Sequence, residues 1–298
     1  IRGPVVVASV PLSRLAELTA EQQVQSVHAA KIWKPLLDES VAETGADIVR
    51  SDYEATGTGV IIGVIDTGID WDHPAFRDPN DTTKTRIKFL WDMSDAAGPP
   101  PMGEFASSGG TEYSEADLNN GLAGTANVRA TDTAGHGTHV ACTVLGDGSR
   151  GGYAGVAPEA ELYFQAMERD SDGQFYSPSM NYLINAAYNN GALTHTNSWG
   201  SQTNYGEYTT DSEDVDDRVN YYDQYWSYDG MTVLFSAGND GSNSDTISPP
   251  ATAKNQLAVA NHHNRGGGAP DTLSSSSSRG PVDDGRLKPD VAAPGSWV

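Results

Sequence analysis

The chain has 298 residues, 37% of them hydrophobic, which is enough for one large domain or two small ones with a sizeable core. Forty acidic residues against 18 basic ones give a formal net charge of −22, so the surface repels phosphate backbones and no nucleic-acid partner is expected. No stretch is long and apolar enough to cross a membrane, so no membrane partner is expected either. The single cysteine, Cys142, excludes an internal disulfide.

The acidic charge has two interpretations that the sequence leaves open. It fits an exported protein with an acidic surface. It also fits adaptation to high salt or calcium, because ions screen the repulsion between like charges. The run DSEDVDD (residues 211–217) is interpreted as a solvated helix start rather than a calcium site, since no oxygen-ligand loop of recognisable spacing is present.

The first 40 residues differ in pattern from the rest. PVVVASV (residues 4–10) predicts a strand, residues 11–23 carry leucines at helical spacing, and VQSVHAAKIW (residues 24–33) predicts a second strand. This small α+β piece is too short to form a core of its own.

From Gly57 onward, strands and helices alternate. GVIIGVID (residues 59–66) is a nearly continuous apolar run, which is typical of a strand covered on both faces. Further strands are expected over residues 160–167, 192–200, 231–239, 256–261 and 288–298, and helices over 177–191 and 214–226. This alternation predicts an α/β fold with a mostly parallel sheet.

Residues 77–132 interrupt the alternation. They are rich in Gly, Pro, Ser and Asp, which are residues typical of turns and loops. We therefore expect a long surface insertion here.

Polar residues stand where several of the predicted strands end. Ligands of parallel sheets bind at the carboxyl ends of the strands, which directs attention to Asp66, to Asn197 with Ser198, and to Ser236 with Asn239. A buried carboxylate needs a partner, although an aspartate in VIDTGID alone can equally be a turn or cap residue. An amide such as Asn239 can form a turn, or it can direct its N–H groups at a developing oxyanion.

The segment DTAGHGTHVACTVLG (residues 132–146) begins with turn residues and continues as a helix. His136 lies in the first turn between two glycines that allow a close backbone approach, which favours a functional histidine. His139 is expected to pack and hydrogen-bond inside, and a metal site is disfavoured because no third ligand is in view. Cys142 is interpreted as a small buried hydrophobe rather than a nucleophile.

Six motifs resemble, in order, those of the subtilisin-like serine proteases, peptidase family S8. They are VIDTGID, GHGTHVA, GVAPEAEL, SWGS, SAGNDG and RGPVDDGRLKPDVAAPG. The resemblance covers residues 46–298 and implies a subtilisin-like three-layer α/β catalytic domain. The segment from PPATAKN (residues 249–255) onward is most similar to the bacterial extracellular, alkaline branch, which implies a secreted protein.

The resemblance implies a serine endopeptidase that acts on protein or peptide substrates. Asp66 matches the carboxylate that orients the catalytic histidine, and His136 matches the general base and later general acid. Asn239 matches the oxyanion-hole donor. This chemistry requires no cofactor, and because the family often binds calcium, structural calcium is a further expectation.

The resemblance also implies a substrate cleft. Residues 198–200 match the strand that pairs with the substrate backbone, and residues 236–238 line the first specificity pocket with Trp199. The substrate-binding residues expected in this way are Ser198, Trp199, Gly200, Ser236, Ala237 and Gly238. Trp199 stands where this family commonly carries a smaller apolar residue, so a substrate preference cannot be carried over.

Residues 1–40 resemble the last part of an N-terminal propeptide, which in this family assists folding and inhibits the enzyme. An ordinary N-terminal extension is the alternative.

No serine of the chain matches the family's nucleophile, which lies in a Gly-Thr-Ser-Met-Ala motif after the APG segment. The serine run TLSSSSSRGP (residues 272–281) lacks that motif and matches a family loop. We therefore expect the nucleophile beyond Val298, and we expect the chain alone to be inactive and to require a complementing C-terminal fragment of the same protein.

Two other functions are alternatives to a protease. One is a non-catalytic, subtilase-like peptide-binding module, which has no need of Asp66, His136 and Asn239 together. The other is an unrelated nucleotide-binding protein, which is disfavoured because no Gly-rich phosphate fingerprint follows the first strand.

Overall fold

The computed structural model describes residues 37–101, 103–167, 179–221, 229–264 and 272–296, together with Arg14, Glu17 and Glu21. The chain divides into two compact units, Ile1–Pro35 and Leu36–Val298, and the second contains the elements described below. The elements predicted within residues 4–33 fall almost entirely outside the described residues. The propeptide hypothesis therefore stays a prediction.

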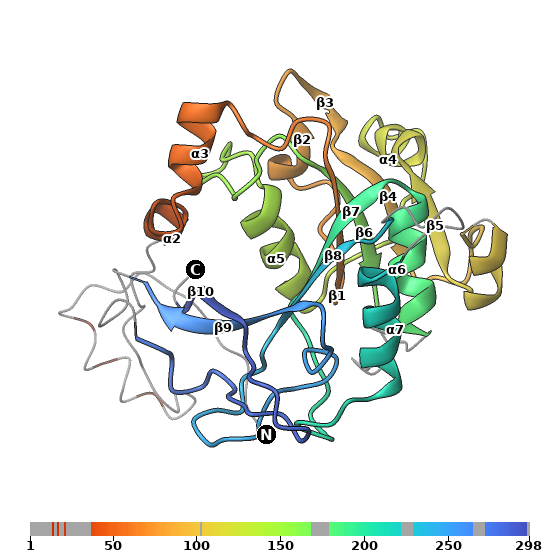
Figure 1. Ribbon diagram of the computed structural model, residues 1–298. Coiled ribbons are helices and arrows are strands. Elements are labelled where there is room, and N and C mark those ends of the chain that lie inside the picture. The colour runs from red at the N-terminus through yellow and green to blue at the C-terminus, as the bar shows by residue number, and fades with distance from the viewer. Residues whose placement is uncertain are drawn as a thin grey trace. The chain divides into compact units, whose positions relative to one another are not determined.

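An eight-stranded sheet runs through the second unit in the order β10-β9-β8-β7-β1-β6-β4-β5 (Figure 1). Its strands are β1 (Ile61–Asp66), β4 (Ile87–Asp92), β5 (Thr111–Ser114), β6 (Glu161–Ala166), β7 (Ala192–Asn197), β8 (Thr232–Ser236), β9 (Leu257–His263) and β10 (Val291–Ser296). Every neighbouring pair is parallel except β4 with β5. The predicted α/β fold with a mostly parallel sheet is therefore confirmed.

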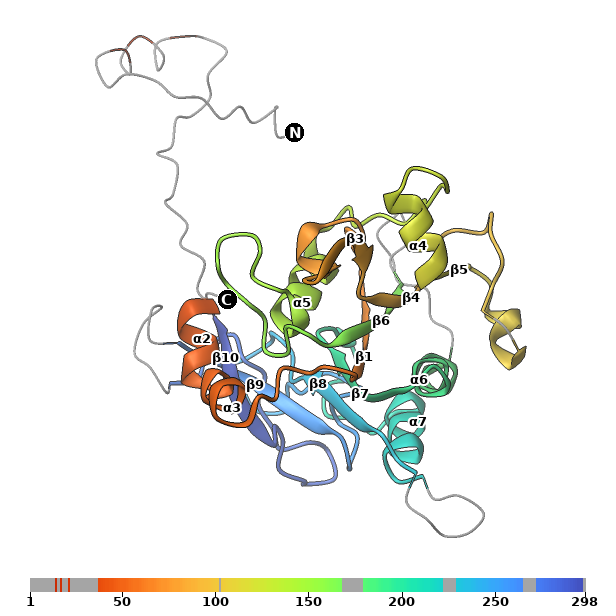
Figure 2. The same cartoon turned by 90° about the horizontal axis from the view of Figure 1, so that it is seen from above.

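Helices lie on both faces of this sheet. Figure 2 shows α5 on one side and α6 with α7 on the other. The helices are α2 (Leu37–Glu43), α3 (Ala46–Tyr53), α4 (Glu115–Leu122), α5 (His136–Leu145), α6 (Met180–Asn189) and α7 (Thr210–Val219), with 3-10 turns η2 (Pro74–Phe76) and η3 (Gly103–Ser108). A two-stranded ribbon, β2 (Arg77–Asp78) with β3 (Asp81–Thr85), completes the described elements.

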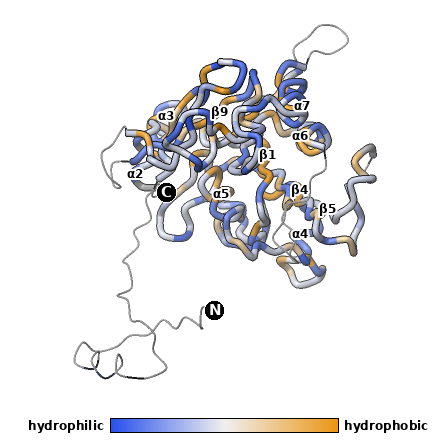
Figure 3. Tube along the Cα trace, turned by 90° about the horizontal axis from the view of Figure 1, so that it is seen from below, coloured by the Kyte–Doolittle hydropathy of each residue, from blue (hydrophilic) through white to orange (hydrophobic). Residues whose placement is uncertain are grey.

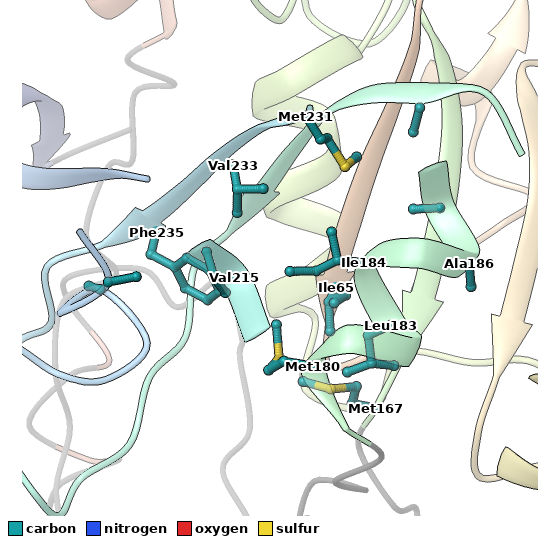
Figure 4. Close-up of a cluster of buried hydrophobic side chains, with 14 of the residues drawn as sticks. Ile65, Met167, Met180, Leu183, Ile184, Ala186, Val215, Met231, Val233 and Phe235 are labelled. Carbon is teal, nitrogen blue, oxygen red and sulfur yellow. The ribbon is translucent and has the colours of Figure 1, made fainter. Parts of the chain in front are cut away.

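Strand β1 lies between two hydrophobic clusters, one on each face of the sheet. Val64 faces the cluster on the α5 side, which includes Phe164, and Ile65 faces the cluster under α6 and α7. Figure 4 shows the second cluster, with Ile65 near Ile184 and with Phe235 on β8, and Figure 3 colours β1 as hydrophobic. Each fully buried side chain of this size contributes roughly 1.5–3 kcal/mol, which explains the continuous apolar run of β1.

The α6 helix matches its prediction closely. The side chain of Ser179 accepts a hydrogen bond from the N–H of Asn181 and begins the helix. Gly191, with a φ of 92°, follows its end and donates its N–H to the carbonyl of Tyr188 at 2.8 Å.

Helix α7 begins earlier than predicted, at Thr210 instead of residue 214, because the side chain of Thr209 caps it by accepting the N–H of Ser212. Residues 222–226 of the predicted helix lie outside the described residues. The acidic run 211–217 does start a helix, but Asp216 is buried rather than solvated. Its carboxylate accepts the Tyr208 hydroxyl at 2.9 Å and the N–H groups of Lys254 and Asn255 at 2.9 and 2.7 Å.

The segment 77–132 is only partly a surface insertion, so that prediction is wrong for its central portion. β4 and β5 belong to the main sheet, and Leu90 and Trp91 are fully buried. The apolar run IKFLWD is short and lies between turn-rich stretches. The composition of the whole segment therefore did not predict a strand there.

Arg86, just before β4, is a buried arginine whose guanidinium is satisfied by backbone carbonyls. It donates to the carbonyls of Ala75 at 2.7 Å, Arg77 at 3.0 Å, Leu145 at 2.6 Å and Ala160 at 2.6 Å. These carbonyls belong to η2, to the start of β2, to the end of α5 and to the entry of β6. One side chain therefore joins four parts of the α5 side of the sheet.

His195 lies fully buried in β7, beside Gly63 of β1. A Cβ on Gly63 would lie 2.3 Å from Cδ2 of the imidazole, so only glycine fits there. The ring nitrogen Nε2 lies 3.3 Å from the side-chain oxygen of Gln165. Burial lowers the pKa of His195 from 6.5 to about 3, so the ring is neutral in the folded protein.

This burial predicts a specific acid sensitivity. Between pH 6.5 and about 3 the unfolded chain binds a proton at His195 that the folded chain excludes, so the free energy of unfolding falls as the pH decreases. One such group contributes a slope of about 1.4 kcal/mol per pH unit. Urea titrations of His195→Gln should show a shallower slope than wild type in this window. Leu193→Gln puts the same side chain at an exposed position of β7 and should keep the wild-type slope; equal slopes in both variants would contradict the assignment.

Candidate active site

Asp66 and His136 form a hydrogen-bonded pair. Asp66 ends β1 with 1% of its surface exposed, and its Oδ1 lies 2.6 Å from Nδ1 of His136, the first residue of α5. A carboxylate only accepts hydrogen bonds here, so Nδ1 carries the proton and the lone pair of the neutral ring is on Nε2. The His136 side chain is 52% exposed, and Nε2 has no hydrogen-bond partner among the described residues. The imidazole is therefore oriented by the bond at Nδ1, while Nε2 is available to accept a proton.

The environment of His136 raises its pKa. The hydrogen bond that His136 donates to Asp66 has the largest effect and raises the pKa above 6.5, while burial opposes this increase and the charges of Asp66 and Asp132 add to it. The neutral, proton-accepting ring therefore predominates only above this raised pKa. Any reaction that uses His136 as a base should increase in rate as the pH rises through that value.

Two glycines permit the contact between α5 and the end of β1. A Cβ on Gly137 would lie 2.2 Å from the carbonyl oxygen of Gly68 and 3.0 Å from Cβ of Asp66. A Cβ on Gly68 would lie 2.2 Å from the carbonyl oxygen of Thr131. The predicted role of the glycines around His136, a close backbone approach, is therefore confirmed for Gly137.

Asp132 is the residue that the sequence interpretation missed. Its Oδ1 accepts the N–H of Gly135 and the hydroxyl of Thr67, both at 2.9 Å. Its Oδ2 accepts the N–H and hydroxyl of Thr138 at 2.8 and 2.6 Å. Asp132 thus joins the start of α5 to the loop after β1. An aspartate four positions before His136, at the start of a predicted helix, is the capping signal that could have identified it.

A hollow of about 630 Å³ opens beside this helix start. Asp70, Trp71, Asp72 and Asp132 are among the residues that line it. Burial raises the pKa of Asp70, and the hydrogen bond and charge of Asp72 add to this effect. The surface next to His136 is therefore concave and acidic.

The other two candidates on α5, His139 and Cys142, differ in their burial. His139 is exposed, so the expectation that it packs inside is wrong; the buried face of α5 consists of Gly137, Ala141 and Leu145. Cys142 is half-buried against the hydrophobic cluster on this side of the sheet. Burial raises the pKa of its thiol to about 11, which agrees with a packing residue.

The predicted substrate segments meet at Ser248. Ser198, Trp199 and Gly200 follow β7, and Ser236, Ala237 and Gly238 end and follow β8. A Cβ on Gly200 would lie 2.8 Å from Cβ of Ser248, and one on Gly238 would lie 2.5 Å from Ser248 Oγ. The N–H of Ser248 also donates to the carbonyl of Ala237 at 3.1 Å. Ser248 was not predicted, because no local pattern reveals it.

Trp199 packs edge-to-face on Phe235, with ring centroids 5.4 Å apart. Its indole is partly buried against the hydrophobic cluster under α6 and α7. Trp199 is therefore held in place by packing, and the indole lies between this cluster and the end of β7.

Asn239 is exposed, three residues after the end of β8. β8 neighbours β7, and β7 neighbours β1, with all three parallel. Asn239 therefore lies at the same edge of the sheet as Asp66. Among the described residues it is not hydrogen-bonded to Asp66 or His136.

Neither a metal centre nor a membrane helix is found among the residues described. Within those ranges, no group of three or more His, Cys, Asp or Glu side chains gathers closely enough to hold a metal ion. None of the described helices has the length and apolarity needed to span a membrane.

Replacing Asp66 by Asn should lower the pKa of His136 by roughly one unit or more, because the amide cannot stabilise the imidazolium as a carboxylate does. The measurement is an NMR titration of the His136 ring protons in the 298-residue chain. Asp72→Asn removes a nearby carboxylate that does not bond to His136 and should leave the midpoint unchanged. An equal midpoint in wild type and Asp66→Asn would show that the pair does not set the protonation of His136.

Replacing Asp132 by Ala should destabilise the protein by about 1–3 kcal/mol, because four donors at the start of α5 and in the loop after β1, most of them partly buried, lose their acceptor. Urea unfolding measures the change in free energy. Asp47→Ala is the matched control, since Asp47 lies in the first turn of α3 but accepts only the N–H of Ile48 at an exposed position. A loss no larger than that of the control would rule out this capping role.

The sequence is similar to those of known serine proteases, which agrees with the geometry of the Asp66–His136 pair. The chain is 29% identical over 296 residues to serine protease AprX of Bacillus subtilis (strain 168), covering 97% of this chain and 58% of AprX. It is 26% identical over 230 residues to the minor extracellular protease Vpr of the same strain, covering 76% of this chain and 23% of Vpr. The chain therefore spans little more than half of the one relative and about a quarter of the other.

Among solved structures, the CspB protease of Clostridium perfringens shares the fold, with a TM-score of 0.66 at 15% identity over 89% of this chain and 79% of that one. The family model of the subtilases matches residues 57–297, which include both members of the Asp–His pair and all eight strands of the sheet. The chain belongs to the subtilase family of serine proteases.

Proposed function

We propose that the complete protein is a serine endopeptidase that hydrolyses peptide bonds in protein or peptide substrates. The observation that carries this proposal is the buried carboxylate of Asp66 bonded to Nδ1 of His136, with Nε2 accessible. Family membership supports the same reaction.

His136 would act as the general base and then the general acid. Nε2 takes the proton of the attacking serine hydroxyl while the serine oxygen bonds to the substrate carbonyl carbon. The same proton passes to the leaving amine, and the acyl-enzyme remains. Water then attacks the acyl-enzyme by the same proton transfers through His136, which releases the carboxylic acid product and restores the serine. The charge of Asp66 stabilises the imidazolium that exists between these transfers.

We propose that the nucleophilic serine lies in the part of the protein after Val298. No serine of residues 1–298 lies in the family's Gly-Thr-Ser-Met-Ala motif. The accessible Nε2 supports this assignment, because a serine from another segment can reach it.

Asn239 would donate its side-chain N–H to the oxyanion, as the order of strands at this edge supports. An extended substrate would lie along residues 198–200 and bond through its main chain. Trp199, held by Phe235, would form a wall of the first specificity pocket with residues 236–238.

We further propose that the protein is exported and belongs to the alkaline, extracellular branch. Support comes from the similarity to a relative named as extracellular and from the formal net charge of −22. Structural calcium and a propeptide at residues 1–40 stay predictions of the same resemblance.

The test is fluorophosphonate labelling of the complete protein, followed by denaturing mass spectrometry. Wild type should take one label on a serine, and His136→Ala should lose it because the serine is no longer activated. His139→Ala, at an exposed position one turn along α5, should keep it. A wild-type protein that binds peptides but takes no label would instead be the non-catalytic module.

A further inference from the structure

The serine run at residues 274–278 has no role in the proposed mechanism, yet three of its five serines are buried. Ser277 and Ser278 have no exposed surface, and Ser274 is 6% exposed. Burying hydroxyl groups is unfavourable unless they are hydrogen-bonded. The partners of these serines therefore indicate what the run does.

Within the described ranges, no contact of its own side chain fixes the orientation of Asn239. It is exposed and, among the described residues, has no hydrogen-bond partner. Its orientation therefore depends on the backbone of Gly238 and Asp240, the residues on either side.

Ser278 bonds to both of these neighbours. Its N–H donates to the carbonyl of Gly238 at 3.0 Å, and its Oγ accepts the N–H of Asp240, also at 3.0 Å. The next N–H, that of Gly241, donates to the carbonyl of Ser276 at 2.9 Å. The backbone is therefore fixed immediately before and immediately after Asn239.

Close packing prevents the backbone around Gly238 from moving nearer to the serine run. Gly238 has a φ of 110°, and a Cβ there would lie 2.7 Å from Ser278 Oγ and 2.5 Å from Ser248 Oγ. The loop already lies as close to the two serines as a glycine backbone permits.

We propose that Ser278 is a positioning residue that holds the amide of Asn239 in the geometry of an oxyanion hole. The inference rests on the proposed function and deepens it. Without the Ser278 hydroxyl, the partly buried N–H of Asp240 loses its acceptor, and the peptide group between Asn239 and Asp240 is free to rotate. The catalytic cost follows from misplacement of the amide, because oxyanion donors act only within a narrow range of distance.

The experiment measures kcat and KM of the complete protein on a peptide substrate. Ser278→Ala should lower kcat by roughly 10-fold to 100-fold with little change in KM, because the misplaced amide acts mainly in the transition state. Asn239→Ala should lower kcat by about 10²–10³-fold, a figure known from a member of this family. Ser277→Ala is the matched control, since Ser277 is equally buried but its Oγ accepts the N–H of Asn261 on β9 at 3.0 Å.

A double mutant separates positioning from general destabilisation. If Ser278 acts through Asn239, Ser278→Ala should have no further effect on kcat in the Asn239→Ala background. Additive losses, or equal losses in Ser277→Ala and Ser278→Ala, would overturn the inference. If wild type takes no fluorophosphonate label, or if Asn239→Ala leaves kcat unchanged, the proposed function itself fails instead.

Amide hydrogen exchange of the 298-residue chain gives a readout that needs no activity. Ser278→Ala should accelerate exchange of the Asp240 N–H, and Ser277→Ala should not. Unchanged protection of Asp240 in Ser278→Ala would show that the hydroxyl does not hold this loop.

Discussion

The carboxylate of Asp66 is the constraint on which the site depends. It lies at the end of a strand that is covered on both faces, and only 1% of its surface is exposed. A charge in such a place is costly unless donors surround it. The N–H of Thr67 and the ring of His136 supply those donors on Oδ1, at 2.8 and 2.6 Å. The position of α5, and the glycines that let it approach β1, follow from this requirement.

The order of the strands explains how distant parts of the sequence reach one site. On one side of β1 lie β6, β4 and β5, which the chain forms in the order β4, β5, β6; on the other side the chain builds outward from β7 to β10. The reversal at β1 leaves a crevice at the carboxyl ends of the strands, where side chains at 66, 198–200 and 236–239 face the same edge. Ser248 and Ser278 then fix the backbone of the last two segments with hydrogen bonds and close packing.

Local patterns in the sequence were enough to predict α6 and the strands of the main sheet outside residues 77–132, because apolar runs and helical repeats reflect burial directly. They failed for β4, whose apolar run is short and lies between turn residues, and for β5 in the same turn-rich segment. They also failed for the start of α7, which depends on the hydroxyl of Thr209. Asp66 and His136 were recognised from motifs, whereas Asp132 and Ser278 were not. Ser278 acts through hydrogen bonds to backbone groups that are distant in the sequence, and such partners leave no periodic signal. Asp132 bonds mainly to Gly135 and Thr138, which are close in the sequence, so its signal is a local one that the motifs did not include.

The four carbonyl bonds of Arg86 have a consequence for how the fold opens. Its guanidinium is satisfied only when η2, β2, the end of α5 and the entry of β6 are all in place. If one of these segments separates, a buried charge is left with missing acceptors, so the segments should open together rather than singly. Partly opened chains are the ones that proteases cut. If the complete protein is the endopeptidase proposed above, such joint opening would reduce the fraction of molecules that other copies of it can digest.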